Sequence, residues 1–190
     1  MNEDVTKDLS DSAFDFQKFV WPKVKDKCGG GELIPMESIT AKEIAKDFDI
    51  LAGVDAWQIQ REDSLIRGIA SRVQWISHPY NSFTIRETRD SGVPTEYEKR
   101  QYVIDKPDKG YLFPALTIQA YLKERKKGPL LSVAVCRTSE LFRYIEQWPK
   151  EIGHNRASNA SFLIVWWKKY KAKGNHIYIW ERNNDNTNNH

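Results

Sequence analysis

Three polar side chains lie within two apolar segments, and their types and spacing could support hydrolysis of a phosphodiester. Asp55 falls in GVDAWQIQ, residues 53–60, and Arg72 and Gln74 fall in IRGIASRVQW, residues 66–75. A carboxylate can bind a divalent cation such as Mg²⁺, which lowers the pKa of a bound water and offsets charge on a phosphate. A long polar or cationic side chain beside that water can orient it or contact the phosphate.

Both segments have the composition of β-strands, and the polar residues 61–64 form the turn between them. Side chains alternate along a strand, so Arg72 and Gln74 share one face, and the apolar residues of residues 66–75 lie mainly on the other. Asp55 stands at the start of the first strand. Adjacent strands hold side chains in fixed positions, which suits a site of this kind.

The rest of the sequence predicts an α/β (α+β) fold, with a central mixed β-sheet flanked by helices in a single domain over residues 12–182. We expect helices over residues 12–27, 138–148 and 167–173, with Pro22 kinking the first or dividing it at Trp21. Further strands are expected over residues 32–36, 82–87, 114–123, 129–135, 161–166 and 176–180, and residues 95–101 predict at least one helical turn. Residues 1–11 and 183–190 are expected to be disordered ends.

The composition fits a globular protein of ordinary domain size. The chain has 190 residues, of which 40% are hydrophobic and 29% charged, with a formal net charge of +3. Its two cysteines form no Cys-x-x-Cys motif and favour a reducing compartment, so we expect a cytoplasmic protein with no membrane span. The sequence contains no G-x-S-x-G, Rossmann or Walker motif, and Cys136 is expected to be buried and inert.

The order of these features resembles the PD-(D/E)XK nuclease superfamily, which includes restriction endonucleases and Holliday-junction resolvases. A helix is followed by the G-V-D-A-W strand, a turn, a strand that ends in R-V-Q and the strand F-T-I-R. The family carries an Asp at the start of one strand and (D/E/Q)-x-K on the next. Asp55 matches that Asp, and Arg72-Val73-Gln74 falls where (D/E/Q)-x-K belongs. The resemblance extends from about Ala13 to Trp180 and implies a restriction-endonuclease-like fold and Mg²⁺-dependent endonuclease activity on DNA.

The resemblance also implies a role for each residue. Asp55 would bind Mg²⁺, Gln74 would position water, and Arg72 would contact the scissile phosphate. Arg72 stands in place of a metal-binding carboxylate or amide, and a guanidinium does not bind cations. A second metal ligand must therefore come from elsewhere, and we expect Asp49. The other candidates are Asp47, Glu32, Glu37, Glu96 and Glu98.

A second interpretation assigns these residues no catalytic role. Arg72 would pair with Asp55 across the strands, Asp55 could also cap the turn at Gly53, and Gln74 would be an edge-strand surface residue. The protein would then be a catalytically inactive module on the same scaffold that binds nucleic acid or a protein partner, and a homodimer is possible. In either case, exposed lysines in two basic segments are candidates for phosphate contacts: Lys126, Lys127, Lys168 and Lys169.

Overall fold

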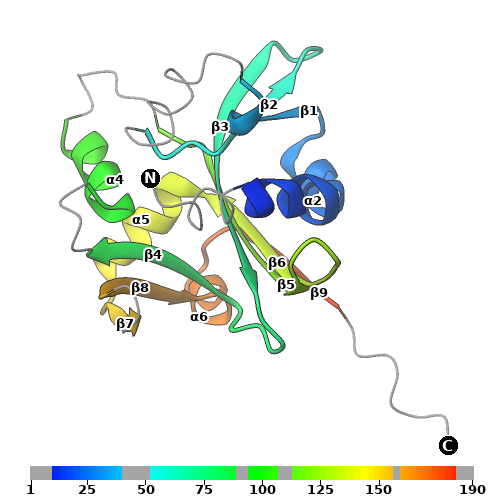
Figure 1. Ribbon diagram of the computed structural model, residues 1–190. Coiled ribbons are helices and arrows are strands. Elements are labelled where there is room, and N and C mark those ends of the chain that lie inside the picture. Colours follow the sequence, from blue (N-terminus) through cyan, green and yellow to red (C-terminus); the bar gives the residue numbers. More distant parts are fainter. Residues whose placement is uncertain (1–9, 40–51, 89–93, 107–112, 156–158, 183–190) are drawn as a thin grey trace, which may run out of the picture.

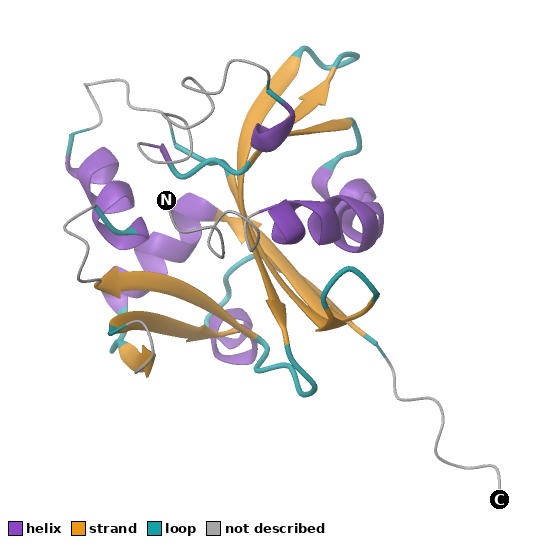
Figure 2. Cartoon of the chain, viewed as in Figure 1, coloured by secondary structure: helices purple, strands orange, loops and turns teal. Residues whose placement is uncertain are grey.

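The computed structural model describes residues 10–39, 52–88, 94–106, 113–155 and 159–182, which form two β-sheets with helices around them (Figures 1 and 2). The larger, mixed sheet has six strands in the order β1 (Glu32–Pro35), β2 (Ala56–Gln60), β3 (Leu65–Trp75), β5 (Leu116–Glu124), β6 (Gly128–Arg137) and β9 (Ile177–Glu181). The smaller sheet has three antiparallel strands in the order β4 (Ser82–Thr88), β8 (Ala160–Trp166) and β7 (Glu151–Asn155).

The strand β3 organises the larger sheet. Its first half pairs antiparallel with β2 and its second half pairs in parallel with β5, and Ile69 takes part in both pairings. All the other pairings in the larger sheet are antiparallel. Because β2 begins at Ala56, opposite Ile69, Asp55 stands where β3 passes from one partner strand to the other.

A helical segment from residue 10 to Cys28 covers one face of the larger sheet (Figure 1). Residues 10–15 are α-helical, and a π-helical turn (Phe16–Val20), α2 (Trp21–Val24) and a 3₁₀ turn (Lys25–Cys28) follow. Proline fits the first turn of a helix, which explains why α2 begins at Trp21, directly before Pro22. The core on this side joins the helical segment to the sheet through Phe16, Val20, Trp21, Val24, Ile69, Val73, Ile118, Leu122 and Val133.

The opposite face of the larger sheet packs against the smaller sheet, α5 (Thr138–Gln147) and α6 (Trp167–Ala172). The apolar face of α5 consists of Leu141, Phe142 and Ile145, which recur at helical spacing. The helix α4 (Glu96–Asp105) packs against β4. It begins with a capping box, in which Thr95 accepts from the Glu98 backbone N–H at 3.2 Å and donates its own to the Glu98 carboxylate at 2.7 Å.

The prediction of an α/β fold with a mixed sheet is confirmed, but two of the predicted strands lie in a second sheet that we did not expect. The strands over residues 82–87 and 161–166 form as β4 and β8, and they join β7 in the smaller sheet. The strand β7 was not predicted, and the helical segment begins at residue 10, inside the end predicted to be disordered. The predicted ends at 1–9 and 183–190 lie outside the described residues. Within the described ranges, no helix has the length and apolar character needed to cross a membrane.

Candidate functional site

The side chain of Arg72 lies where the larger sheet, the smaller sheet and α4 meet. Its Nη2 lies 3.1 Å from the Glu96 Oε2 in a salt bridge, and its Nη1 donates to the Thr84 Oγ1 at 3.2 Å. Its guanidinium carbon lies 5.4 Å from the centroid of the Phe162 ring. Arg72 is 27% exposed, so its guanidinium is held in a partly solvated corner rather than in the core.

The strand period places Arg72 on this side of the sheet, as the sequence predicts. Ile69, Val73 and Trp75 face the N-terminal helical segment and belong to its core. Arg72 and Gln74 therefore face the other way, toward the smaller sheet. The salt bridge of Arg72 that the structure describes is with Glu96, one of the alternative carboxylates considered from the sequence.

Arg100 links Glu96 to the segment that carries Asp55. Glu96 and Arg100 lie one turn apart on α4, with Arg100 Nη2 3.9 Å from Glu96 Oε1. Arg100 Nη1 donates to the Ala52 carbonyl oxygen at 2.7 Å, and its Nη2 donates to that of Gly53 at 3.0 Å. Burial lowers the pKa of Arg100, and the nearby charges of Glu96 and Asp55 oppose that shift. One guanidinium therefore contacts both Glu96 and the backbone two residues before Asp55.

Backbone and side-chain hydrogen bonds fix the position of Asp55. Its N–H donates to the Ile69 carbonyl oxygen at 2.8 Å, and its own carbonyl oxygen accepts from the Met36 N–H at 3.0 Å. Its carboxylate Oδ2 accepts from the Ser71 N–H at 2.5 Å. One carboxylate oxygen therefore continues the hydrogen bonds between β2 and β3 before the start of β2, and Asp55 as a whole is half-buried.

Gln119 lies opposite Arg72 on β5, and the sequence analysis did not select it. Its Oε1 accepts from the Thr84 Oγ1 at 3.3 Å and from the Thr84 N–H at 3.4 Å. Within the described part of the chain, the buried Nε2 of Gln119 and the buried Oε1 of Gln74 have no hydrogen-bond partner. A buried amide group without a hydrogen-bond partner carries a desolvation cost. On the face that carries Arg72, the Gln119 Nε2 is therefore a donor, and the Gln74 Oε1 an acceptor, that a ligand or water could satisfy.

The sequence showed Gln119 and Thr84 as ordinary strand residues, and their role depends on contacts between strands. The register of the parallel β3–β5 pair brings Gln119 beside Arg72. The hydroxyl of Tyr121, two residues further along β5, donates to the Ser82 carbonyl oxygen at 2.9 Å. This hydrogen bond connects the larger sheet to the smaller sheet near Arg72. Arg100 was also missed, because a charge on a polar helix gives no sign of burial. It is 2% exposed.

The carboxylates present fit a magnesium ion in kind. Asp55 and Glu96 offer hard oxygen donors, and Mg²⁺ in nucleic-acid enzymes is usually bound through one or two carboxylates plus substrate phosphates. Among the described residues no group of three His, Cys, Asp or Glu side chains could hold a metal. Asp47 and Asp49, the latter our expected second ligand, lie outside the described residues. Glu32 is exposed on β1 and pairs with Arg61 at 2.9 Å, and Glu98 belongs to the capping box of α4.

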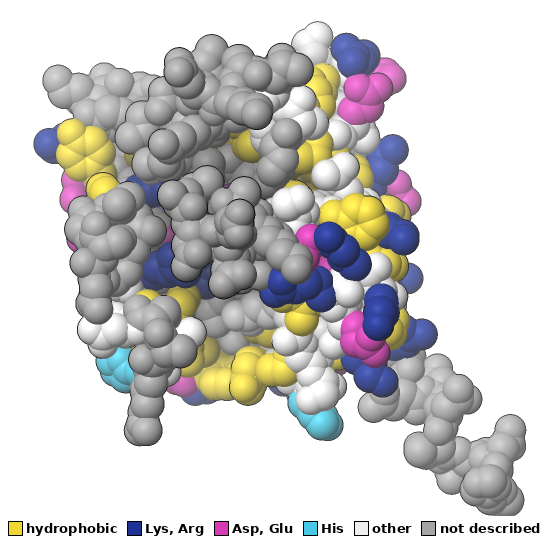
Figure 3. Space-filling model, in the orientation of Figure 1, with side chains coloured by type: hydrophobic (Ala, Val, Ile, Leu, Met, Phe, Trp, Pro, Cys, Tyr) yellow, Lys and Arg dark blue, Asp and Glu magenta, His cyan; other side chains and the backbone are white. Residues whose placement is uncertain are grey.

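Most of the lysines proposed for phosphate contacts have acidic partners. Lys126 forms a salt bridge with the buried Asp11. Lys127 lies 3.3 Å from Glu124, and Lys169 pairs with Glu151. Figure 3 shows Lys and Arg side chains beside Asp and Glu on the side that carries α2 and the β5–β6 turn. Lys168 is exposed on α6, with no ion-pair partner among the residues that the structure describes.

No protein-family model matches the chain, and comparison with curated proteins and with solved structures found no match either. The restriction-endonuclease-like fold implied by the short motifs around Asp55 and Arg72 therefore remains a proposal, which depends on the geometry of the site.

Proposed function

We propose that the protein is a Mg²⁺-dependent nuclease, or a relative of such nucleases, that binds DNA at the corner around Arg72 and hydrolyses a phosphodiester there. One observation carries the proposal. Arg100 donates to the Gly53 carbonyl oxygen at 3.0 Å, two residues before Asp55 at the start of β2, and the same guanidinium lies 3.9 Å from Glu96 at the start of α4. Two carboxylates from distant parts of the chain thus lie near the part of β3 that carries Arg72 and Gln74: Glu96 pairs with Arg72, and Asp55 accepts from the Ser71 N–H.

The order of elements supports a relation to the PD-(D/E)XK superfamily. A helical segment precedes β1, the candidate Asp stands at the start of β2, and Arg72-Val73-Gln74 lies on β3, the neighbour of β2 in the sheet. A helix and further strands then follow, as the resemblance implies, with β5 parallel to β3. The order of elements along the chain thus supports the proposal, although the F-T-I-R strand, β4, lies in the smaller sheet.

Each residue would then have a distinct role. Asp55 and Glu96 would hold the ion together with Asp49, the ligand expected from the sequence, and the ion would supply charge stabilisation and an activated water. Arg72 has five N–H donors, enough to keep its bond to Thr84 and also contact a phosphate oxygen. Gln74 and Gln119 would orient water through the amide atoms that have no partner in the described part of the chain. Arg100 would position both carboxylates.

Replacement of the two carboxylates tests this function. We expect Asp55→Ala and Glu96→Gln each to abolish Mg²⁺-dependent cleavage of DNA while the far-ultraviolet circular dichroism stays that of the wild type. Asp63→Ala is the matched control, since Asp63 is an exposed carboxylate in the turn that joins β2 and β3. It should cleave as the wild type does. Undiminished cleavage by Asp55→Ala would exclude the proposed site.

A second candidate function is a catalytically inactive module that binds nucleic acid or a protein partner. The salt bridge between Arg72 and Glu96 favours it, because it offsets the charge of a carboxylate that a metal would need. Calorimetry with MgCl₂ separates the two functions. The nuclease should bind Mg²⁺ with an affinity that Asp55→Ala reduces, whereas the inactive module should give no Mg²⁺ signal and, if its partner is nucleic acid, should bind DNA in a salt-sensitive manner without cleaving it.

A further inference from the structure

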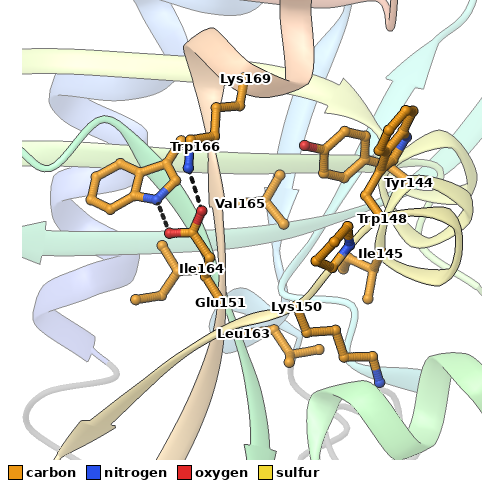
Figure 4. Close-up of a pocket in the computed structure, with 11 residues that line it drawn as sticks. Tyr144, Ile145, Trp148, Lys150, Glu151, Leu163, Ile164, Val165, Trp166 and Lys169 are labelled. Atoms are coloured by element: carbon orange, nitrogen blue, oxygen red, sulfur yellow. Dashed lines mark hydrogen bonds and ion pairs between the residues drawn. The ribbon is translucent and has the colours of Figure 1, made fainter. Parts of the chain in front are cut away.

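One face of the smaller sheet is not covered by the hydrophobic core. The register pairs Thr84 of β4 with Ile164 of β8, and Arg86 with Phe162. These residues, with Trp166, alternate with buried residues of the second core: Phe83, Ile85, Leu163 and Val165. Figure 4 shows Ile164 and Trp166 on one side of β8, and Leu163 and Val165 on the other, toward Tyr144 and Ile145. We call the first side the β8 face, which consists of Thr84, Arg86, Phe162, Ile164 and Trp166.

An aromatic ring with a cation nearby stands at each end of the β8 face. The rings of Phe162 and Trp166 are both partly exposed. The guanidinium carbons of Arg72 and Arg86 lie 5.4 and 5.6 Å from the centroid of the Phe162 ring. At the other end, the Trp166 Nε1 donates to the Glu151 carboxylate, which also accepts from Lys169 (Figure 4).

The β8 face is continuous with the candidate functional site through Arg72. The same guanidinium lies over Phe162, bonds to Thr84 on the β8 face and pairs with Glu96 on α4. A ligand that lies along the face from Trp166 to Phe162 therefore arrives at Arg72 and its partner Glu96.

We infer that the β8 face binds a single-stranded segment of nucleic acid and leads it to Arg72, so that the substrate class of the proposed nuclease is single-stranded. This inference rests on the proposed function. Exposed rings and guanidinium planes on a sheet stack with bases, and a base can reach such a surface only when it is not stacked within a duplex. The guanidinium groups of Arg72 and Arg86, which both lie by the Phe162 ring, are complementary in charge to the phosphates that join those bases.

Equilibrium binding without metal tests the inference separately from catalysis. The probe is a fluorescently labelled DNA strand of about ten nucleotides, within the site size of single-strand-binding surfaces, and the same strand annealed to its complement. Fluorescence anisotropy is measured in EDTA for the wild type and for Phe162→Leu and Trp166→Leu. We expect each substitution to weaken binding of the single strand by about tenfold and to change duplex binding by less than about twofold, because a duplex offers only its phosphates.

Trp148→Leu is the matched control. Trp148 is also a partly exposed tryptophan with a cation over its ring, since Lys173 Nζ lies 3.7 Å from the ring centroid, but it follows α5 on the other side of β8 (Figure 4). This variant should bind the single strand as the wild type does. An equal loss in Trp148→Leu, or unchanged single-strand binding by Phe162→Leu and Trp166→Leu, overturns the inference.

A measurement on the wild-type protein covers the case in which a variant fails to fold. A single strand that contains 5-bromouracil is cross-linked by ultraviolet light, and the attached peptides are identified by mass spectrometry. We expect cross-links to Phe162 or Trp166, and attachment only elsewhere overturns the inference. Cleavage that persists in Asp55→Ala removes the proposed function without altering this result, so the two failures can be told apart.

Discussion

Arg100 Nη1 donates to the carbonyl oxygen of Ala52 at 2.7 Å, and this bond ties α4 to the segment that enters β2. The same guanidinium donates to the Gly53 carbonyl oxygen at 3.0 Å and lies 3.9 Å from Glu96. A buried arginine is tolerated only when its charge is offset and most of its donors are matched, and these partners offset the charge and occupy both terminal nitrogens, while Nε has no partner among the described residues. The contact therefore sets the position of Asp55, two residues after Gly53, relative to Glu96.

Arg100→Met tests how much the fold depends on this contact. The substitution retains a long side chain but leaves the Ala52 and Gly53 carbonyl oxygens without their donor, and Glu96 keeps only its salt bridge with Arg72. We expect the free energy of unfolding to fall by about 3 kcal/mol, as measured by urea denaturation. Arg137→Met is the control, because Arg137 is 74% exposed and lies 3.8 Å from Glu140. Its loss should be under about 0.5 kcal/mol, and equal losses in the two variants would contradict a special role for Arg100.

Gly53→Ala tests the close approach of Arg100 to the backbone. A Cβ at Gly53 would lie 2.7 Å from Arg100 Nη1, and the residue has a φ of +59°. Gly174 is the matched control, since it also has a positive φ, of +83°, but a Cβ there would meet nothing within 4 Å. We expect Gly174→Ala to cost about 1 kcal/mol from backbone strain alone and Gly53→Ala to cost distinctly more. Similar losses of stability in the two variants, measured by thermal denaturation, would show that the Arg100 side chain can move away from the new Cβ at no cost.

The elements of this fold could largely be predicted because their signals are local. The polar turn at residues 61–64, the face of β3 that carries Arg72, and the start of α2 at Trp21 all follow from periodicity or from a proline. The partition of the strands between two sheets could not be predicted in this way. The strand β4 has an ordinary alternating pattern, and its partner β8 lies more than 70 residues later in the chain. The short β7, with mostly exposed side chains, gave no apolar pattern.

The residues of the candidate site also differ in whether a local sequence pattern or a long-range contact identifies them. Asp55, Arg72 and Gln74 could be selected because they are polar residues in apolar strands. Glu96 was one of several possible carboxylates, and only the packing of α4 against β4 distinguishes it. Gln119 depends on the parallel register of β3 and β5, which no local pattern encodes. The lysines were chosen by local charge density, and the sequence did not reveal that Asp11 and Asp15 would cover the β5–β6 turn.

The contact between the N-terminal helical segment and the β5–β6 turn leads to a prediction about those lysines. Asp15 accepts from the Lys126 backbone N–H at 2.9 Å and from the Trp75 Nε1 at 2.6 Å, and Asp11 pairs with the Lys126 side chain. Because a buried carboxylate already offsets its charge, Lys126 has little to offer a phosphate. We expect Lys126→Ala to lower the free energy of unfolding by about 1 kcal/mol and to leave DNA affinity within twofold, on the order of experimental scatter.

Lys168→Ala should show the reverse pattern. Its side chain is exposed on α6, so its removal should leave stability unchanged. If the basic end of α6 contacts phosphates, the slope of log affinity against log salt should fall by about one. Binding isotherms at several salt concentrations, together with urea denaturation of both variants, give the comparison. A loss of affinity in Lys126→Ala with no change in Lys168→Ala would reverse the assignment.

The buried thiol of Cys28 predicts how stability depends on alkaline pH. Burial raises the pKa of Cys28 from 9.0 to about 11, although Arg67 opposes the shift. The folded state therefore keeps a proton that the unfolded state has released, so the stabilisation is fully present below pH 9 and is lost as pH rises toward 11. Across this window, the contribution of Cys28 falls by about 2–3 kcal/mol.

Cys28→Ala isolates this contribution. The backbone carbonyl oxygen of Cys28 accepts from Gln58 and Arg67, so the substitution keeps those bonds and removes only the thiol. Urea denaturation between pH 8 and about pH 11 should give a shallower decline in the free energy of unfolding for the variant than for the wild type. Both proteins retain Cys136, Tyr121 and Tyr170, whose pKa values burial also raises, so those groups cancel in the difference. Parallel curves would mean that the thiol ionises as readily in the folded protein as in the unfolded chain.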